Sequence, residues 1–358
     1  MGSKETVCVT GASGFIGSWV VRLLLDRGYS VQGTVQDLGN EKETKHLEAM
    51  EGAKERLKLF QIDLLDYGSI EAAVNGSVGV FHLASPCIVE EVENPQPRWG
   101  EKRGAFYSLG GGEERGAFYS LGGGDPLTLL AQLLDPAVKG TMHVLQAAQK
   151  AKVKRVVLTS STAATIPSPN WPANVPKDEN CWTDLDYCKD NGIWYPASKT
   201  LAEKTAWDFA KETGLDVVVI NPGTVLGPIL PPSQSINASM AMFRQILEGA
   251  TDGYQNLYTG CVHVKDVAEG HILLYGTPSA SGRHLCVEAT THWSDFAEMV
   301  AKLYPEYKIH RFTEVTQPGL LRDPNAPKKL TDLGLIFTSM EQIIKDSVSS
   351  LKERGFLN

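Results

Sequence analysis

Thr6-Val7-Cys8-Val9-Thr10-Gly11-Ala12-Ser13-Gly14-Phe15-Ile16-Gly17 is the stretch that decides the fold. Its β-branched, apolar beginning predicts a buried strand, and apolar residues at helical spacing over 15–27 predict a helix directly after the turn. Glycines spaced G-x-x-G-x-x-G let the backbone approach a pyrophosphate, and free N–H groups at a helix start attract anions. The stretch therefore predicts a dinucleotide site, while a tight turn without a ligand is the alternative. The expected cofactor contacts here are Gly11, Ser13, Gly14, Phe15, Ile16 and Gly17.

Strand-like and helix-like segments alternate along the rest of the chain. Apolar runs predict further strands at 30–35, 57–62, 78–83, 155–159 and 216–221. Helical spacing predicts helices at 70–74, 136–150 and 197–213. Alternation with continuous apolar strands is typical of a parallel sheet that is covered on both faces. We therefore expect an α/β fold, with a Rossmann-type doubly wound parallel sheet over 4–227. A smaller C-terminal substrate lobe is expected over 228–358, with 263–288 returning to the sheet.

The composition disfavours several functions. Lysine and arginine number 34 against 42 aspartates and glutamates, so the formal net charge of −8 disfavours nucleic-acid binding. No apolar run approaches the roughly 18 residues that a membrane-spanning helix needs. The N-terminal residues contain no apolar signal segment, and the six cysteines are scattered without a Cys-x-x-Cys pair. We therefore expect a cytoplasmic protein with free thiols and no metal, nucleic-acid or membrane partner; protein partners stay open.

The end of the second predicted strand bears on the choice between NAD and NADP. An acidic side chain there holds the ribose 2′-hydroxyl of NAD, whereas a basic one accepts the 2′-phosphate of NADP. The chain has the neutral Gln36 followed by Asp37, with Lys42 and Lys45 a few residues later. Gln36, Lys42 and Lys45 are the candidate contacts, and they leave both NADPH and NADH possible.

The next two predicted strands end in further candidate contacts. Asp63 and Leu64 end the third strand, where a side chain reaches the adenine. The fourth strand leads to the nicotinamide half of the site through Leu83, Ala84 and Ser85. His82, in the same strand, is interpreted as a structural residue rather than a catalytic one.

Three residues form a candidate catalytic group. Tyr195 and Lys199 are spaced i, i+4, which places both on one face of a helix. Ser161 follows the fifth apolar run, at the carboxyl edge where open α/β sheets bind their ligands. The ammonium of Lys199 favours the tyrosinate form of Tyr195, which suits Tyr195 to donate a proton to a carbonyl oxygen that Ser161 polarises. Lys199 and Tyr195 are also candidate contacts of the nicotinamide ribose.

Together these residues resemble the extended short-chain dehydrogenase/reductases, and most of all the plant cinnamoyl-CoA reductase and dihydroflavonol reductase branch. The resemblance covers nearly everything except residues 97–131. It is carried by the segments 7–19, 81–86, 134–141, 157–161, 221–228 and 262–268.

The resemblance implies further roles. In that family the second serine of the Thr-Ser-Ser run is catalytic, which favours Ser161 over Ser160. The Asn-Pro-Gly-Thr-Val segment contacts the nicotinamide end, which implies cofactor contacts at Pro222, Gly223, Thr224 and Val225. NADPH is the family's usual cofactor, and a small aromatic carbonyl compound is the implied substrate.

Two departures from the family pattern concern cofactor and substrate. Family members usually carry Arg or Lys where this chain has Gln36. Cinnamoyl-CoA reductases typically read Asn-Trp-Tyr-Cys-Tyr-Gly-Lys around the catalytic tyrosine, whereas this chain reads Ile193-Trp194-Tyr195-Pro196-Ala197-Ser198-Lys199. A simple aldehyde or ketone is therefore as plausible a substrate as a CoA thioester.

The leading hypothesis is an NADPH-dependent reductase of an aromatic or phenylpropanoid carbonyl, with the proton supplied by Tyr195. A nucleotide-sugar epimerase or dehydratase with tightly bound NAD is one alternative, because it shares the fold and the catalytic group. A catalytically silent cofactor-binding protein is the other.

Residues 97–131 form a glycine-rich insert. The twelve residues 101–112 recur as 113–124 with one change, Lys102 to Glu114. Glycine triplets make an ordered state entropically costly, so the sequence predicts a disordered excursion. A coding accident such as a tandem duplication is the favoured origin, and a lid over the nicotinamide side is the functional alternative.

Overall fold

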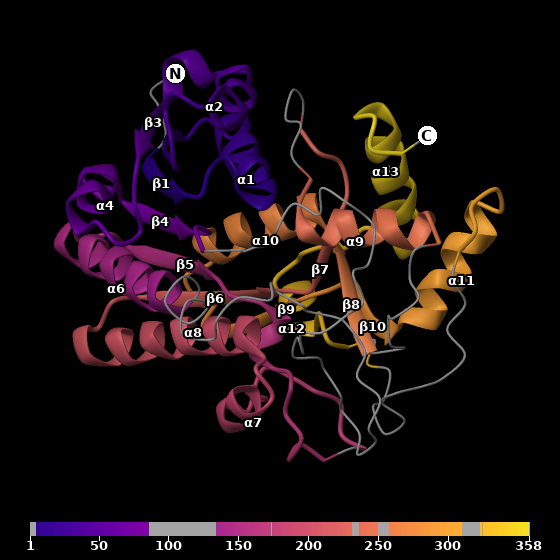
Figure 1. Cartoon of the computed structure of the whole chain (residues 1–358). Coiled ribbons are helices and arrows are strands. Elements are labelled where there is room, and N and C mark those ends of the chain that lie inside the picture. Colours follow the sequence, from indigo (N-terminus) through magenta and orange to yellow (C-terminus); the bar gives the residue numbers. More distant parts are fainter. Residues whose placement is uncertain are drawn as a thin grey trace, which may run out of the picture.

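The computed structural model describes residues 5–85, 134–172, 174–230, 236–249, 258–309, 323 and 325–357. The insert at 97–131, for which the sequence predicts disorder, lies outside the described residues. The apolar runs of the sequence form the strands of one large sheet (Figure 1). Its strands are β1 (Thr6–Thr10), β2 (Ser30–Val35), β3 (Leu57–Gln61), β4 (Gly79–His82), β5 (Arg155–Thr159), β6 (Val217–Pro222) and β9 (Gly282–Cys286).

The large sheet has the order β3-β2-β1-β4-β5-β6-β9, and every neighbouring pair is parallel. The order reverses between β1 and β4, which is the point where an open α/β sheet forms its ligand crevice. The predicted doubly wound parallel sheet is confirmed.

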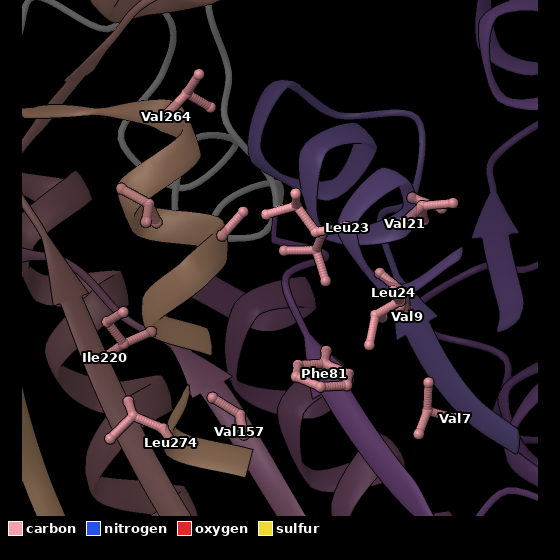
Figure 2. Close-up of a cluster of buried hydrophobic side chains, with 14 of the residues drawn as sticks. Val7, Val9, Val21, Leu23, Leu24, Phe81, Val157, Ile220, Val264 and Leu274 are labelled. Carbon is pink, nitrogen blue, oxygen red and sulfur yellow. The ribbon is translucent and has the colours of Figure 1, made fainter. Parts of the chain in front are cut away.

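Strand residues point alternately to two apolar cores. Val7, Val9 and Phe81 belong to one core, while Cys8 and Val80 on the same strands belong to the other. Figure 2 shows the first core between the sheet and the helices that cover it. Both faces are buried, which is why these strands are continuously apolar rather than alternating.

Helices cover the two faces. On the first face α1 (Phe15–Asp26) packs against α10 (Val264–Gly276). On the other face α6 (Asp135–Lys150) packs between α4 (Tyr67–Val74) and α8 (Trp194–Thr213). Short helices complete the connections: α2 (Glu41–Glu48), α3 (Ala53–Arg56), the 3₁₀ turn η2 (Thr162–Ala164) and α7 (Leu185–Asp190).

A second, three-stranded sheet of order β10-β8-β7 lies beside the large one (Figure 1). It comprises β7 (Thr224–Leu226), β8 (Tyr258–His263) and β10 (Ala289–His292). The helices α9 (Ala238–Leu247), α11 (Trp293–Leu303) and α13 (Met340–Glu353) surround it, whereas α12 (Lys328–Asp332) packs against β9 of the large sheet. Side chains of α9, α11 and α13 share an apolar core that includes Phe243, Trp293 and Phe296.

The chain changes sheets at Gly223. Pro222 ends β6 in the large sheet and Thr224 begins β7 in the small one, so β7 lies outside the large sheet although the sequence division at 227 places it there. A Cβ at Gly223 would lie 2.1 Å from the Gly260 carbonyl oxygen on β8. Only glycine permits this close crossing. The chain re-enters the large sheet at β9, within 263–288.

Helix α8 begins earlier than its predicted start at residue 197. It starts at Trp194, so Tyr195 and Pro196 lie in its first turn. Proline is tolerated there because the first N–H groups of a helix have no partner within the helix. The earlier start places Tyr195 within the same helix as Lys199.

Candidate active site

The glycine turn after β1 is held by close backbone packing. Gly11 has φ +68°, and a Cβ there would lie 3.0 Å from the backbone N and Cα atoms of Ala84. A Cβ at Gly17 would lie 2.0 Å from the Gly11 carbonyl oxygen. Gly14 precedes α1 as its N-cap and has no side chain to occupy the first N–H groups. The turn therefore presents backbone N–H groups at a helix start, as a pyrophosphate requires. Ser13, Phe15 and Ile16 lie in the same turn and the first residues of α1.

Buried side chains fasten the segment after β4 to this turn. The Thr10 hydroxyl oxygen accepts hydrogen bonds from the N–H groups of Leu83 (3.1 Å) and Ala84 (3.0 Å) and lies 2.8 Å from His82 Nδ1. Burial, followed by the positive charge of Lys199, lowers the pKa of His82 to about 3, so its ring is neutral. Because the Thr10 oxygen already accepts two hydrogen bonds, the Thr10 hydroxyl donates its hydrogen bond to His82 Nδ1. The ring proton of His82 is then on Nε2, which lies 3.3 Å from Thr141 Oγ1. His82 is thus an anchor for the loop that continues to Ser85.

The carboxylate of Glu43, in α2, lies at the end of β2 and is not among the residues that the sequence predicts for the site. The Gln36 N–H donates to Glu43 Oε2 at 2.8 Å, and Asn40 Nδ2 donates to Glu43 Oε1 at 3.1 Å. Lys45 instead pairs with Glu41 at 2.5 Å on the exposed face of α2, and Lys42 is also exposed. The signal was present: Asn40 is the N-cap of α2 and Glu43 follows three residues later, the spacing of a capping box.

The end of β3 places its two candidates differently. Asp63 is exposed, and its Oδ1 accepts the N–H of Leu65 at 2.9 Å. Leu64 packs against α6. Its Cβ would lie 2.9 Å from a Cβ built on Gly140, and its carbonyl oxygen lies 3.0 Å from His143 Nδ1. Asp63 is therefore exposed at the end of β3, while much of the Leu64 side chain packs against α6.

Ser161 lies between β5 and η2 and is the N-cap of η2. Its hydroxyl oxygen accepts the N–H of Ala163 at 3.1 Å, and its hydroxyl lies 3.5 Å from the Pro222 carbonyl oxygen. The Ser161 carbonyl accepts a hydrogen bond from Asn221 Nδ2 at 3.2 Å. The ends of β5 and β6 are therefore joined through Ser161, at the carboxyl edge of the sheet.

Tyr195 and Lys199 lie one turn apart on α8, which packs against η2. Lys199 Nζ lies 5.8 Å from the centre of the Tyr195 ring, and both side chains are half-buried. The charge of Lys199 also lowers the pKa of His82, which places this ammonium close to the end of β4. The helix thus brings both residues to the edge at which Ser161 lies.

The segment after β6 is shaped mainly by packing. Gly223 adjoins β8, Val225 is buried in the first core, and Thr224 Oγ1 lies 3.4 Å from Thr259 Oγ1. Pro222 is the member of this group whose carbonyl approaches the Ser161 hydroxyl. Any contact of Gly223 with a cofactor would therefore use its backbone.

The described part of the chain contains no group of three or more His, Cys, Asp or Glu side chains arranged to hold a metal ion. Five cysteines in those residues are free and buried, and burial raises the pKa of the Cys8 and Cys188 thiols to about 12. Among the described helices, none combines the length and apolar character needed to span a membrane.

Two family matches cover most of the chain. Residues 8–97 match the GDP-mannose 4,6 dehydratase family, and residues 124–287 match the NAD dependent epimerase/dehydratase family. Among individual relatives, cinnamoyl-CoA reductase 2 of Medicago truncatula is 43% identical over 357 residues, covering 99% of this chain and 94% of the relative. Tetraketide alpha-pyrone reductase 1 of Arabidopsis thaliana is 37% identical and covers 99% of this chain and 98% of that protein.

Two solved structures of reductases superpose on nearly the whole chain. Vestitone reductase from alfalfa (Medicago sativa) superposes with a TM-score of 0.76 at 28% identity, covering 99% of this chain and all of that one (100%). Gre2 from Candida albicans in complex with NADPH superposes with a TM-score of 0.74 at 25% identity, covering 98% of this chain and 99% of the other.

Proposed function

The chain belongs to the extended short-chain dehydrogenase/reductases, in the branch of the cinnamoyl-CoA reductases, and from this premise we propose that it is an NADPH-dependent reductase of an aromatic carbonyl compound. The observation that carries the proposal is the convergence of Ser161 with the Tyr195–Lys199 pair of α8 at the carboxyl edge of the sheet. Full-length similarity to carbonyl reductases supports it.

The residues around the glycine turn fit the proposed cofactor. The turn packs so closely on α1 that no side chain fits at Gly17, because a Cβ there would meet the Gly11 carbonyl oxygen at 2.0 Å. Gly11, Gly14 and the start of α1 would hold the pyrophosphate, and Lys199 would hold the nicotinamide ribose. When bound, the reduced nicotinamide supplies the hydride.

The chain's own residues supply the proton and orient the substrate. Ser161 donates a hydrogen bond to the substrate carbonyl oxygen and so polarises the carbonyl. Tyr195 transfers its phenolic proton to that oxygen as negative charge develops on it. Lys199, near the Tyr195 ring, stabilises the tyrosinate that remains.

The substrate class follows from the relatives and from the departures in sequence. Relatives named cinnamoyl-CoA reductase support an aromatic, phenylpropanoid-type carbonyl. The residues that surround Tyr195 differ from the typical cinnamoyl-CoA reductase pattern, as Pro196 and Ala197 illustrate. We therefore propose an aldehyde or ketone substrate alongside the CoA thioester.

The test measures cofactor oxidation by the purified full chain with NADPH or NADH. The substrates offered are cinnamoyl-CoA thioesters, cinnamaldehyde, phenylacetaldehyde and dihydroflavonols. Tyr195→Phe should lower kcat by about 100-fold or more, since general acid catalysis contributes on that scale. Tyr275→Phe is the matched control, because this tyrosine bonds Glu5 at the opposite, amino edge of the sheet.

Two results would overturn the proposal. Equal turnover by Tyr195→Phe and the parent would remove Tyr195 as the proton donor. NAD retained in a one-to-one ratio through purification, without turnover of any carbonyl, would favour a nucleotide-sugar epimerase or dehydratase instead.

A further inference from the structure

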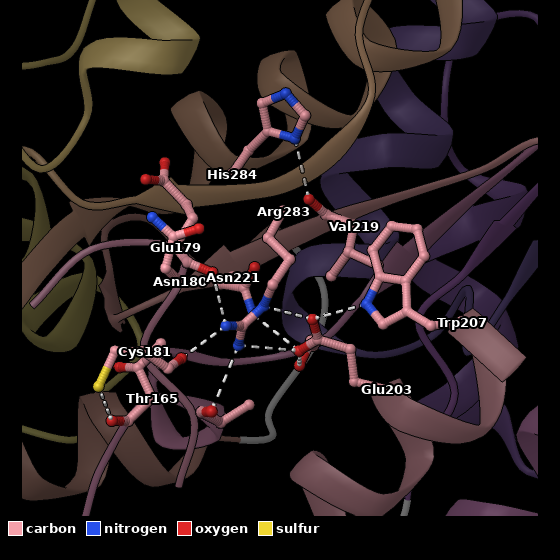
Figure 3. Close-up of polar contacts among 12 residues, drawn as sticks. Thr165, Glu179, Asn180, Cys181, Glu203, Trp207, Val219, Asn221, Arg283 and His284 are labelled. Carbon is pink, nitrogen blue, oxygen red and sulfur yellow. Dashed lines mark hydrogen bonds and ion pairs between the residues drawn. The ribbon is translucent and has the colours of Figure 1, made fainter. Parts of the chain in front are cut away.

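A buried carboxylate lies one helical turn beyond Lys199. Glu203 of α8 has no exposed surface, and four side chains donate hydrogen bonds to it (Figure 3). Its Oε2 accepts from Ser160 Oγ at 2.6 Å and Asn221 Nδ2 at 3.0 Å. Its Oε1 accepts from Arg283 Nε at 2.6 Å and Trp207 Nε1 at 3.3 Å. One carboxylate therefore joins α8 to the ends of β5 and β6 and to β9.

Arg283 extends this connection to the segment before α7. Its guanidinium donates to the carbonyl oxygens of Glu179 (2.9 Å), Cys181 (2.6 Å) and Ala164 (3.3 Å). It also stacks on Trp182, with Cζ 3.9 Å from the ring centre. Ala164, Glu179, Cys181 and Trp182, which lie between Ser161 and α7, are thus fastened to the same ion pair.

The contacts of Glu203 reach both parts of the proposed catalytic group. Ser160 precedes Ser161, and Asn221 also donates to the Ser161 carbonyl at 3.2 Å. Helix α8 itself carries Tyr195 and Lys199. The contacts of Glu203 therefore set the distance between the hydroxyl that polarises the carbonyl and the residues that deliver its proton.

A contribution to stability alone does not explain why a charged pair, Glu203 and Arg283, is buried at this place. Two charges removed from water gain little over apolar residues of the same volume, because desolvation offsets their attraction. What a carboxylate does, and an apolar side chain does not, is to hold four donors in fixed directions. We propose that Glu203, with Arg283, is a positioning residue that fixes Ser161 relative to Tyr195 and Lys199. The proposal rests on the proposed reductase function.

The same sheet contains a matched control at its opposite edge. Arg155, also buried, bonds Asp216 at 2.8 Å and donates to the carbonyl oxygens of Leu274 and Thr277. It begins β5, whereas the proposed site lies past the end of β5. A loss of this arginine removes a buried guanidinium and its ion pair with the exposed Asp216, without touching the catalytic group.

The experiment compares Glu203→Gln, Ser160→Ala and Arg155→Met with the parent full-length protein. Steady-state kinetics, thermal unfolding, NADPH binding and hydrogen–deuterium exchange of the peptide spanning 159–165 are measured for each. Glu203→Gln should lower kcat by about 100-fold, the cost of a misplacement near 1 Å, with KM and NADPH affinity little changed. Exchange in 159–165 should accelerate.

The two other variants separate positioning from stability. Arg155→Met should lower the melting temperature while kcat and the exchange of 159–165 stay at parent values. Ser160→Ala keeps the ion pair and the fold, so its intermediate loss of kcat tests the proposal if Glu203→Gln does not fold. The proposal is overturned if Ser160→Ala, or folded Glu203→Gln, keeps parent kcat and parent exchange.

Failure of the proposed function gives a different result. A parent protein that reduces no carbonyl refutes the reductase assignment. The exchange data then decide the positioning role alone: acceleration in Glu203→Gln but not in Arg155→Met supports it, and equal exchange in both refutes it.

Discussion

Gly17→Ala is a direct test of the glycine turn as the pyrophosphate site. The added Cβ would stand 2.0 Å from the Gly11 carbonyl oxygen and 2.9 Å from its carbon. To reach the 3.4 Å at which ordinary contact begins, turn and helix must separate by about 1.4 Å. A shift of this size takes an N–H at a normal 2.9 Å from a phosphate oxygen out of hydrogen-bond range.

The expected magnitudes follow from this displacement. Loss of one hydrogen bond to a charged group costs about 1.5–3 kcal/mol, so the Kd for NADPH should rise by about 10- to 150-fold. The cost of overpacking, about 1–3 kcal/mol, is offset by about 1 kcal/mol because alanine favours the helix. The variant should therefore fold and yet bind the cofactor poorly.

The assay is a fluorescence titration of NADPH with the parent, Gly17→Ala and Gly276→Ala, with melting temperatures measured in parallel. Gly276 ends α10, and nothing lies within 4 Å of a Cβ there, so this control should bind as the parent does. A folded Gly17→Ala protein with the parent Kd would refute the reasoning, because the turn would then tolerate the displacement.

Two further predictions concern charge. Glu43→Gln removes the carboxylate at the end of β2 and should raise the preference for NADPH over NADH by about tenfold, roughly 1.5 kcal/mol, as the ratio of kcat/KM values measures; an unchanged ratio would separate Glu43 from the 2′-phosphate position. His82 has its pKa lowered to about 3, whereas in the unfolded chain it takes up a proton below about 6.5. The unfolded state therefore gains protons first, and the melting temperature should fall as the pH drops from about 6.5 toward 3, less steeply in His82→Gln. Parallel curves for His82→Gln and the parent would contradict the assignment.

Local patterns predicted most of the large sheet. The strands at 30–35 and 155–159 match β2 and β5. In β5 the match follows from a run of apolar residues in a strand that is buried on both faces. The glycines predicted the turn at 11–17 because glycine occurs where a Cβ would collide with nearby backbone. At Gly17 a Cβ would lie 2.0 Å from the Gly11 carbonyl oxygen. The Tyr195–Lys199 spacing placed two side chains on one helical face, and both lie in α8.

The sequence by itself determined the strands, the glycine turn and the face of α8, since each depends on neighbours within a few residues. Only the tertiary structure decided that the chain changes sheets at Gly223 and that glycine is needed there, because the carbonyl that a Cβ would meet belongs to Gly260 on another strand. It likewise decided that Glu43 lies at the end of β2 and that Glu203 meets Arg283, eighty positions away in the chain. Packing brings such side chains together across long sequence separations, and no local periodicity records which distant groups will share one buried site.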